Sequence, residues 1–239
     1  MTSRRLRRFS GLLVAGAAAM AFIGPLGFVG TALARYLDAS QVDLIHILPP
    51  PAAPDTAAGK ADLEAVLTAQ QARTAADVKR AQDDDVLTVF RFTDVMGEGF
   101  TAEKMPFATA FFKDVGADGG SVVNPARAHF ARRRPKAVDA RVQPVVEAGG
   151  GSYPSGTAAF AYEAAILLAD MVPEKATAIF ARAADWGHNR VVSGVHYPSD
   201  VEAARIAGSV IDNVLLHNAA FMVDFDKAKA EVRHAIGLE

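Results

Sequence analysis

Apolar residues along most of this chain recur every three or four positions, which is the spacing of an amphipathic helix. The spacing starts after residue 60 and breaks near Thr74, with positions of one face at Leu63, Val66, Leu67, Gln70, Val78 and Ala81. Residues 86–114 continue with positions that we interpret as core: Val89, Phe92, Val95, Met96, Phe100, Phe107, Phe111 and Phe112. The C-terminal part is the most helical in pattern, over 158–171, 175–187 and 199–217, with Pro173 and Pro198 at helix starts.

Alternating strand patterns are scarce, and the chain carries no visible internal repeat. With 239 residues, 51% of them hydrophobic, it is long enough to bury one substantial core. These patterns predict a single compact all-α domain over residues 61–239. Residues 35–60 contain four prolines that disfavour helix, so we expect a proline-rich extended arm laid over the domain surface: Pro49, Pro50, Pro51 and Pro54.

The N-terminus has the layout of a secretory signal peptide. Arginines at positions 4, 5, 7 and 8 precede an apolar stretch from Gly11 to about Gly30, and Ala32-Leu33-Ala34 matches a small-x-small cleavage site. We therefore predict a signal peptide over residues 1–34 and a periplasmic or secreted mature chain without a stable membrane span. The apolar stretch is long, so an uncleaved membrane anchor is the alternative. The paired arginines leave the twin-arginine export route open.

Composition narrows the possible functions. The formal net charge is −2, which argues against a nucleic-acid-binding surface. The chain has no cysteine, which excludes disulfides, thiolate nucleophiles and cysteine metal sites. The run Asp83-Asp84-Asp85 could suggest a metal site, but such a run is more often a solvated loop or a helix start favoured by the helix dipole, and we interpret it so.

Three short segments interrupt the apolar helices with charge or glycine, and the first is R-A-H-F-A-R-R-R-P, which ends at Pro135. Arg127 and Arg134 are seven residues apart, so a continuous helix would present both on one face, two turns apart. Two guanidinium groups aimed the same way repel each other unless an anion lies between them, and their planar geometry suits phosphate oxygens. A basic, solvated helix end is the alternative interpretation.

The second segment is G-G-G-S-Y-P-S-G-T, from Gly149 to Thr157, and it leads directly into a predicted helix. Glycines let the backbone approach a ligand closely, and Ser155 can cap the helix with its hydroxyl. The free N–H groups at such a helix start form a natural anion site. An ordinary serine cap after a flexible loop is the alternative.

The third segment is N-R-V-V-S-G-V-H-Y-P-S-D, with Arg190 near a helix end, His196 in the connection and Pro198 at the next helix start. Asp200 then falls in the first turn of that helix, from which its carboxylate could reach one nitrogen of His196. An aspartate that fixes the tautomer leaves the other nitrogen free to attack, as in catalytic triads. A lone histidine beside a helix start is usually structural, but arginine, histidine and aspartate at these spacings favour a catalytic site.

These segments resemble the signature of the type 2 phosphatidic acid phosphatase and vanadium haloperoxidase superfamily, K-x6-RP, then PSGH, then SR-x5-H-x3-D. Within it the chain is most similar to the class A bacterial non-specific acid phosphatases. The likeness covers roughly residues 40–217 and includes L-P-P-P-A, K-A-D-L, Q-x-x-R-T and V-V-S-G-V-H-Y-P-S-D-V-E-A-A-R. It implies a helical phosphatase domain that acts on small phosphomonoesters and binds inorganic phosphate, and it leaves a homo-oligomer open.

The resemblance also implies a role for each matching position. His196 would be the nucleophile that forms a phosphohistidine, and Asp200 would orient its ring. No metal or other cofactor would be required, since arginines and N–H groups can supply the positive field that a metal would otherwise give. The phosphate oxygens would be bound by Arg127, Arg134, Ser155, Gly156, Thr157 and Arg190.

Three positions depart from the signature. Arg127 stands where the family has lysine, and Asn189 replaces the serine before Arg190. The third departure matters most, because Thr157 replaces the histidine that protonates the leaving alcohol in the family. General acid catalysis typically supplies ~10²–10⁴-fold, so its loss should hurt alkyl esters more than aryl or acyl phosphates. The helix rotation of ~100° per residue points three substitutes away from the phosphate: His188, His129 and Glu163; a water held by Thr157 is the remaining source.

Three hypotheses follow from these residues. The first is a secreted acid phosphatase that is impaired or narrowed in substrate range by Thr157. The second is a catalytically silent protein that binds phosphate or phosphoesters. The third is a peroxidase that uses vanadate bound to His196.

Overall fold

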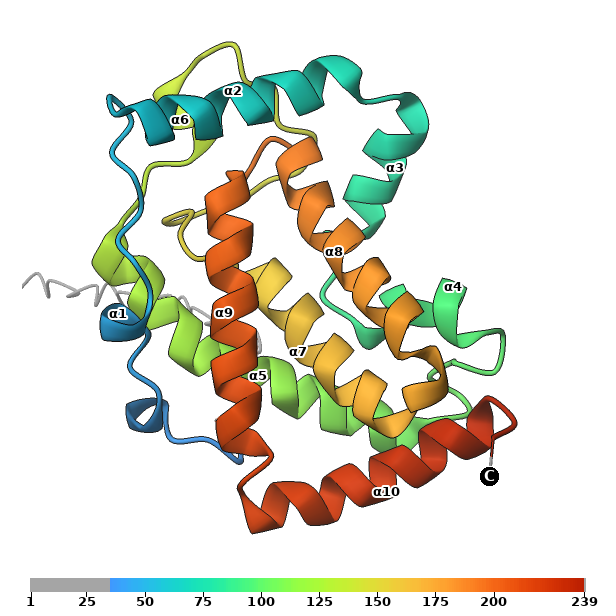
Figure 1. The fold of residues 1–239 in the computed structure, drawn as a ribbon. Coiled ribbons are helices and arrows are strands. Elements are labelled where there is room, and N and C mark those ends of the chain that lie inside the picture. The colour runs from blue at the N-terminus through green and yellow to red at the C-terminus, as the bar shows by residue number, and fades with distance from the viewer. Residues whose placement is uncertain (1–34, 239) are drawn as a thin grey trace, which may run out of the picture. The chain divides into compact units, whose positions relative to one another are not determined.

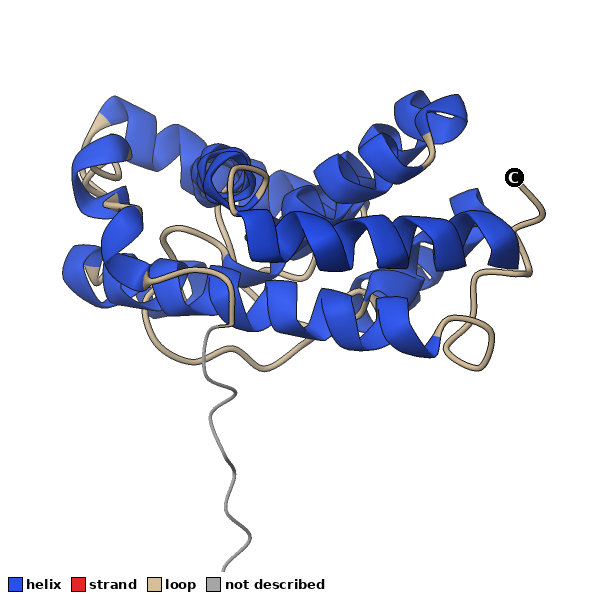
Figure 2. Ribbon diagram, turned by 90° about the horizontal axis from the view of Figure 1, so that it is seen from below, coloured by secondary structure: helices blue, strands red, loops and turns tan. Residues whose placement is uncertain are grey.

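The described part of the chain is built from helices joined by turns and loops. The computed structural model describes residues 35–238, and within that range it contains no β-strand (Figure 2). The prediction of an all-α fold is therefore confirmed for those residues. In chain order, with η for a short 3-10 helix, the elements are η1 (Ala39–Gln41), α1 (Leu44–Ile47), α2 (Ala57–Ala72), α3 (Ala75–Asp83), η2 (Val89–Phe92), α4 (Thr93–Met96), α5 (Pro106–Phe130), α6 (Pro135–Val138), α7 (Gly156–Met171), η3 (Pro173–Lys175), α8 (Ala176–Val192), α9 (Pro198–Leu215) and α10 (Ala219–Ala235).

Helix α7 is the centre of the core. It contacts α5, α8, α9 and α10, and in Figure 1 it lies between α8 and α9. Small side chains let these neighbours approach closely, and on α9 Gly208 lies against the α7 backbone. The buried alanines of α7 are Ala158, Ala159, Ala161, Ala164 and Ala165. Helix α7 is therefore buried on most sides, beginning with Ala158 and Ala159 in its first turn.

Two helices, α8 and α10, differ from the sequence pattern. The pattern over 175–187 stops at Gly187, whereas α8 continues to Val192. Gly187 does not end the helix, because it lies where a Cβ would collide with the Val201 side chain of α9. The glycine permits close helix packing. In addition, α10 is a separate helix that the pattern did not predict, and it packs against α5.

The aspartate run was predicted to be a solvated loop or a helix start, and for Asp84 this is wrong. The run lies at the end of α3, and the side chain of Asp84 is only 1% exposed. Its carboxylate accepts hydrogen bonds from Arg182 and Asn189 of α8, and its carbonyl accepts one from Trp186 Nε1 at 2.6 Å. These bonds satisfy the buried charge and fasten α3 to α8.

Residues 35–60 were predicted to form an extended arm, but η1, α1 and the first residues of α2 lie within this range, so only part of it is extended. The segment is fastened to the other helices at several points. Tyr36 is buried, its N–H donates to Asp118 at 3.1 Å, and its hydroxyl donates to Asp224 at 2.9 Å. Further along, the carbonyl of Pro49 accepts a 2.5 Å hydrogen bond from the Tyr153 hydroxyl. The predicted signal peptide lies outside the described residues. Within the described range, no single helix has the length and apolar character to cross a bilayer; α9 and α10 pass that test only as a pair bent by 103°.

Candidate active site

His196 lies in a tight connection between α8 and α9. Gly194 turns the chain with φ of +77°, a conformation that glycine adopts without strain, and Pro198 starts α9. Asp200 lies in the first turn of α9. Its Oδ2 accepts a 2.9 Å hydrogen bond from the Tyr197 N–H and lies 3.2 Å from His196 Nδ1. This geometry keeps a proton on Nδ1 and leaves the Nε2 lone pair available.

Arg134 contacts the other side of the His196 ring. The expectation that Arg127 and Arg134 share a helix face is wrong, because α5 ends at Phe130 and Ala131 adopts a left-handed conformation with φ of +45°. The turn nevertheless brings the two guanidinium groups together. Arg134 Nη1 lies 3.2 Å from His196 Nε2 and donates to the Val195 carbonyl at 2.8 Å.

The predicted glycine segment wraps around both guanidinium groups. Arg127 Nη2 donates to the carbonyls of Gly149 and Gly151 at 3.1 and 3.0 Å, and Arg134 Nη2 donates to the same two carbonyls at 2.7 and 3.2 Å. Gly150 has φ of +66°, and its carbonyl oxygen accepts a 3.2 Å hydrogen bond from Arg134 Nε. Carbonyl oxygens therefore occupy donor groups that a phosphate would use.

Ser155 is the N-cap of α7. Its buried hydroxyl oxygen accepts from the Ala158 N–H at 3.3 Å, so its own proton is free to donate. The Ser155 N–H donates to the Asp200 backbone carbonyl at 3.1 Å, which ties the second predicted segment to the third. A Cβ on Gly156 would stand 3.5 Å from Arg127 Nη1, so the helix start lies directly beside the arginines.

Arg190 reaches the site from the last turn of α8. Its side chain is 3% exposed, and Nη1 lies 2.8 Å from Asp85 Oδ1 without the alignment of a hydrogen bond. Nε has no hydrogen-bond partner among the described residues while Nη1 is ion-paired with Asp85, and a buried guanidinium with an unpartnered donor is suited to bind an anion. The neighbouring Asn189 amide donates to Asp84 at 2.7 Å and so is turned toward α3.

The electrostatics of the site favour a neutral histidine among cations that need an anion. Burial lowers the pKa of His196 to about 4; Asp200 opposes this shift, and Arg134 and Arg190 add to it. Burial also lowers the pKa of Arg134 to about 10, with Arg127 and Arg190 adding and Asp200 opposing. A bound dianion would relieve both the desolvation and the mutual repulsion.

The structure thus brings the predicted residues of all three segments together, but the residues considered as substitute acids lie elsewhere. His129 and His188 are exposed. Glu163 is buried beside Gly119 of α5, and the Asp118 carboxylate adds to the burial that raises its pKa. Thr157 is the second residue of α7 and is partly buried. Within residues 35–238, no group of three or more histidine or acidic side chains is arranged to hold a metal ion.

Sequence reasoning missed Arg132, which binds Asp200, and Asp62, which binds Arg132. Arg132 lies inside the first predicted segment, and Asp62 lies in the K-A-D-L stretch quoted for the resemblance. Arg132 Nη1 donates to Asp200 Oδ1 at 2.6 Å, and Nη2 donates to Asp62 Oδ2 at 2.8 Å. Their charge and position in shared motifs were the available signals.

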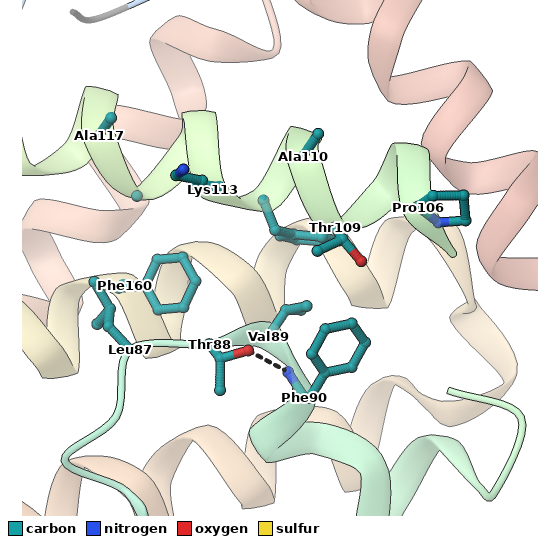
Figure 3. Close-up of a pocket in the computed structure, with 12 residues that line it drawn as sticks. Leu87, Thr88, Val89, Phe90, Pro106, Thr109, Ala110, Lys113, Ala117 and Phe160 are labelled. Carbon is teal, nitrogen blue, oxygen red and sulfur yellow. Dashed lines mark hydrogen bonds between the residues drawn. The ribbon is translucent and has the colours of Figure 1, made fainter. Parts of the chain in front are cut away.

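Two cavities are relevant to where a substrate could bind. One, of about 280 Å³, is bordered by Arg134 and Val195 together with Lys136 and Glu147. The other, of about 610 Å³, lies between residues 87–90 and the first half of α5 and is shown in Figure 3. It is mostly apolar and contains none of the predicted site residues. Of these two cavities, the one beside Arg134 is therefore the one that borders predicted site residues.

Comparison with known proteins shows which proteins the chain is similar to. Residues 115–221 match the model of the PAP2 superfamily. The chain is 28% identical to a non-specific acid phosphatase of Salmonella typhimurium, over 86% of this chain and 90% of that protein. It is 41% identical to a non-specific acid phosphatase of Providencia stuartii, over 34% of this chain and 33% of that protein.

Among solved structures, the chain is similar in fold to a bacterial vanadium-dependent iodoperoxidase, with a TM-score of 0.55 and 17% identity. The match covers 72% of this chain and spans only 52% of the length of that one. At this identity the likeness concerns the helical fold alone. Residues 115–221 thus match the PAP2 superfamily model, and the chain is similar to a bacterial non-specific acid phosphatase over most of its length.

Proposed function

We propose that this protein is an exported acid phosphatase that hydrolyses small phosphomonoesters through a phosphohistidine on His196. The observation that carries the proposal is the arrangement of the imidazole, with Nδ1 at Asp200 and Nε2 at the arginine cluster. The names of the relatives support the reaction class. Export rests on the sequence pattern of residues 1–34.

The first chemical step transfers the phosphoryl group to histidine. The phosphoryl oxygens bind to Arg127, Arg134 and Arg190 and to the N-terminus of α7, replacing the glycine carbonyls. The Nε2 lone pair of His196 attacks phosphorus, the ester P–O bond breaks, and its electron pair leaves on the ester oxygen. Asp200 stabilises the positive charge that develops on the ring.

In the second step a water oxygen attacks the phosphorus of the phosphohistidine. The P–N bond breaks, its electron pair returns to Nε2, and phosphate is released as the water loses a proton. The guanidinium groups hold the charge of the phosphoryl oxygens throughout, which is the main contribution a protein makes to phosphoryl transfer. Because the pKa of His196 is about 4, its nucleophilic form persists into the acid range.

The proposal is tested with purified protein and an aryl phosphate, whose leaving group needs little protonation. We expect measurable release of phenol from the wild type and its loss, by more than about 10³-fold, in His196→Ala, because removal of a nucleophile abolishes the covalent route. His188→Ala is the matched control, since that histidine is exposed on α8. Equal rates for the wild type and His196→Ala would refute the proposal.

Thr157 favours a second candidate, a protein that binds phosphate without turnover. Its hydroxyl is too weak an acid to replace an imidazolium, so leaving groups that need a proton would not depart at a useful rate. This candidate predicts that inorganic phosphate raises the melting temperature while neither aryl nor acyl phosphates are hydrolysed. Rapid hydrolysis of either ester would exclude it.

A further inference from the structure

Arg132 connects the histidine–aspartate pair to a distant helix. Its side chain is 8% exposed and makes hydrogen bonds to three side chains, Asp200, Ser199 and Asp62, at 2.6, 2.7 and 2.8 Å. The guanidinium also lies over the ring of Tyr197, 3.9 Å from its centre. A planar group held by two carboxylates and an aromatic face has little freedom to move.

Asp62 provides the second anchor of this network. It belongs to α2, and besides Arg132 it accepts from the backbone N–H of Ser199 at 3.3 Å and from the Ser199 hydroxyl. The first turn of α9, which carries Asp200, is therefore held from outside by α2 and by the segment after α5. Among the described residues, the hydrogen bonds of Arg132 and Asp62 do not include Arg127 or Arg190.

Asp200 divides its two oxygens between two partners. Oδ1 accepts from Arg132, and Oδ2 faces His196 Nδ1 and the Tyr197 N–H. Burial opposes the charge on Arg132, but Asp200 and Asp62 outweigh it and raise the pKa of Arg132. Arg132 therefore stays a cation, and it compensates the negative charge that Asp200 would otherwise direct wholly at the histidine.

We propose that Arg132 is a positioning residue for the phosphoryl transfer, which clamps the Asp200 carboxylate in the orientation that presents His196 Nε2 to phosphorus. This inference rests on the proposed phosphatase function for its kinetic part only. The clamp holds the histidine tautomer in the free protein, before any substrate binds, so it has a readout of its own.

That readout is the titration and tautomer of His196 followed by nitrogen NMR, with His196→Ala to assign the signal. The charged groups that face the ring are Asp200 from α9, Arg134 from the start of α6 and Arg190 from α8. In Arg132→Ala we expect the pKa of His196 to rise by about one unit, because a nearby cation is lost. We also expect mixed tautomers. Arg132→Lys keeps the charge, so the pKa should stay near the wild-type value.

Kinetics supply the second readout. With an aryl phosphate, kcat should fall about 10- to 100-fold in Arg132→Ala, the usual loss when a supporting group behind an active-site side chain is removed. In Arg132→Lys, kcat should fall about tenfold, since one ammonium group cannot replace the several donors of the guanidinium group. The dissociation constant for inorganic phosphate should stay within about threefold of wild type. Arg133→Ala is the control, because Arg133 is exposed and donates only to the Ala137 carbonyl.

Two results would overturn the inference. One is an unchanged His196 titration and kcat in both Arg132 variants. The other is a parallel loss of phosphate binding and turnover with an unchanged histidine pKa, which indicates a merely structural role. If Arg132→Ala does not fold, judged by circular dichroism, a wild-type kcat in Arg132→Lys has the same meaning. If the wild-type protein has no turnover, the phosphatase proposal fails while the NMR titration still decides on the clamp.

Discussion

In the proposed mechanism, Thr157 determines which esters the site can use. It follows Gly156 in the first turn of α7, beside the arginine cluster, and within residues 35–238 none of the residues considered as substitute acids lies at that position. The proposed nucleophile, His196, and the arginines lie together beside it. The proposed reaction should therefore depend more on the leaving group than it would with a histidine at position 157.

The substitution Thr157→His tests this dependence. We expect kcat/KM for an alkyl phosphate to rise by about 10²-fold or more, because an imidazolium can protonate the departing alkoxide. For an aryl phosphate, which leaves as a stable anion, the rise should be below about tenfold. Rates are measured for both esters at about pH 5. Equal gains for the two would mean that position 157 does not serve the leaving group.

At the residue scale, motif spacing identified the charges but not their local geometry. Arg127 and Arg134 were predicted to converge because a helix would align them, whereas a left-handed turn at Ala131 brings them together. The same turn directs Arg132 toward Asp200. Spacing along an assumed helix cannot reveal such a turn, because alanine gives no warning of a positive φ.

At the scale of elements, the start of α7 combines two tasks in one hydroxyl. Ser155 accepts from the Ala158 N–H, which satisfies a helix donor, and its proton remains available for a phosphate oxygen. Helix periodicity predicted this helix to within two residues. The position of its first turn at the site could be predicted only from the serine and glycine before it.

Replacement of Ser155 should separate these tasks. Ser155→Ala should lower the free energy of unfolding by ~1 kcal/mol and Ser155→Gly by only a few tenths, as for other N-caps. Both should weaken phosphate binding severalfold, because both remove the hydroxyl. Stability is measured by urea unfolding and binding by calorimetry. Thr56→Ala, at the N-cap of α2, is the control that should lose stability but keep phosphate affinity; unchanged affinity in both Ser155 variants would contradict the dual role.

At the scale of the whole molecule, three buried acidic residues lie on three helices: Asp118 on α5, Glu163 on α7 and Asp212 on α9. Glu163 of α7 and Asp212 of α9 are fully buried, and Glu163 Oε2 and both Asp212 oxygens lack a hydrogen-bond partner. Burial raises the pKa of Glu163 to about 8, with Asp118 of α5 adding to the shift. Burial, with Glu163 adding, also raises the pKa of Asp212. The folded protein therefore holds these protons at pH values where the unfolded chain releases them.

The sign of the pH dependence follows directly. Between the ordinary pKa of 4.5 and the raised value of about 8, folding keeps a proton on Glu163, so rising pH lowers stability across that window. The free energy of unfolding should fall between about pH 5 and pH 8 in the wild type. In Glu163→Gln this fall should be smaller by a few kcal/mol, at ~1.4 kcal/mol per pKa unit. Urea unfolding at both pH values measures it. The exposed Glu98→Gln should behave as wild type, and parallel slopes for Glu163→Gln and wild type would contradict the shift.

The sequence pattern predicted the helical class of the whole molecule but not which polar residues become buried. Asp84 and Glu163 are both deep in the core, and neither differs in type from a surface acid. Their burial depends on how α3, α7 and α8 meet, which no local pattern encodes. Asp84 is compensated by Arg182, whereas the Glu163 carboxyl has only other acids near it.

The contacts of Asp62, Asp85 and Pro49 with the site have a practical consequence. All three precede residue 115, so they lie outside the stretch that matches the superfamily model. A fragment excised at residues 115–221 would keep the nucleophile and the phosphate-binding arginines. It would lose three groups: the Asp62 carboxylate that binds Arg132, the Asp85 carboxylate beside Arg190 and the Pro49 carbonyl that accepts the Tyr153 hydrogen bond. The motif-bearing stretch is therefore not a transplantable module, and chimeras should be joined upstream of residue 35.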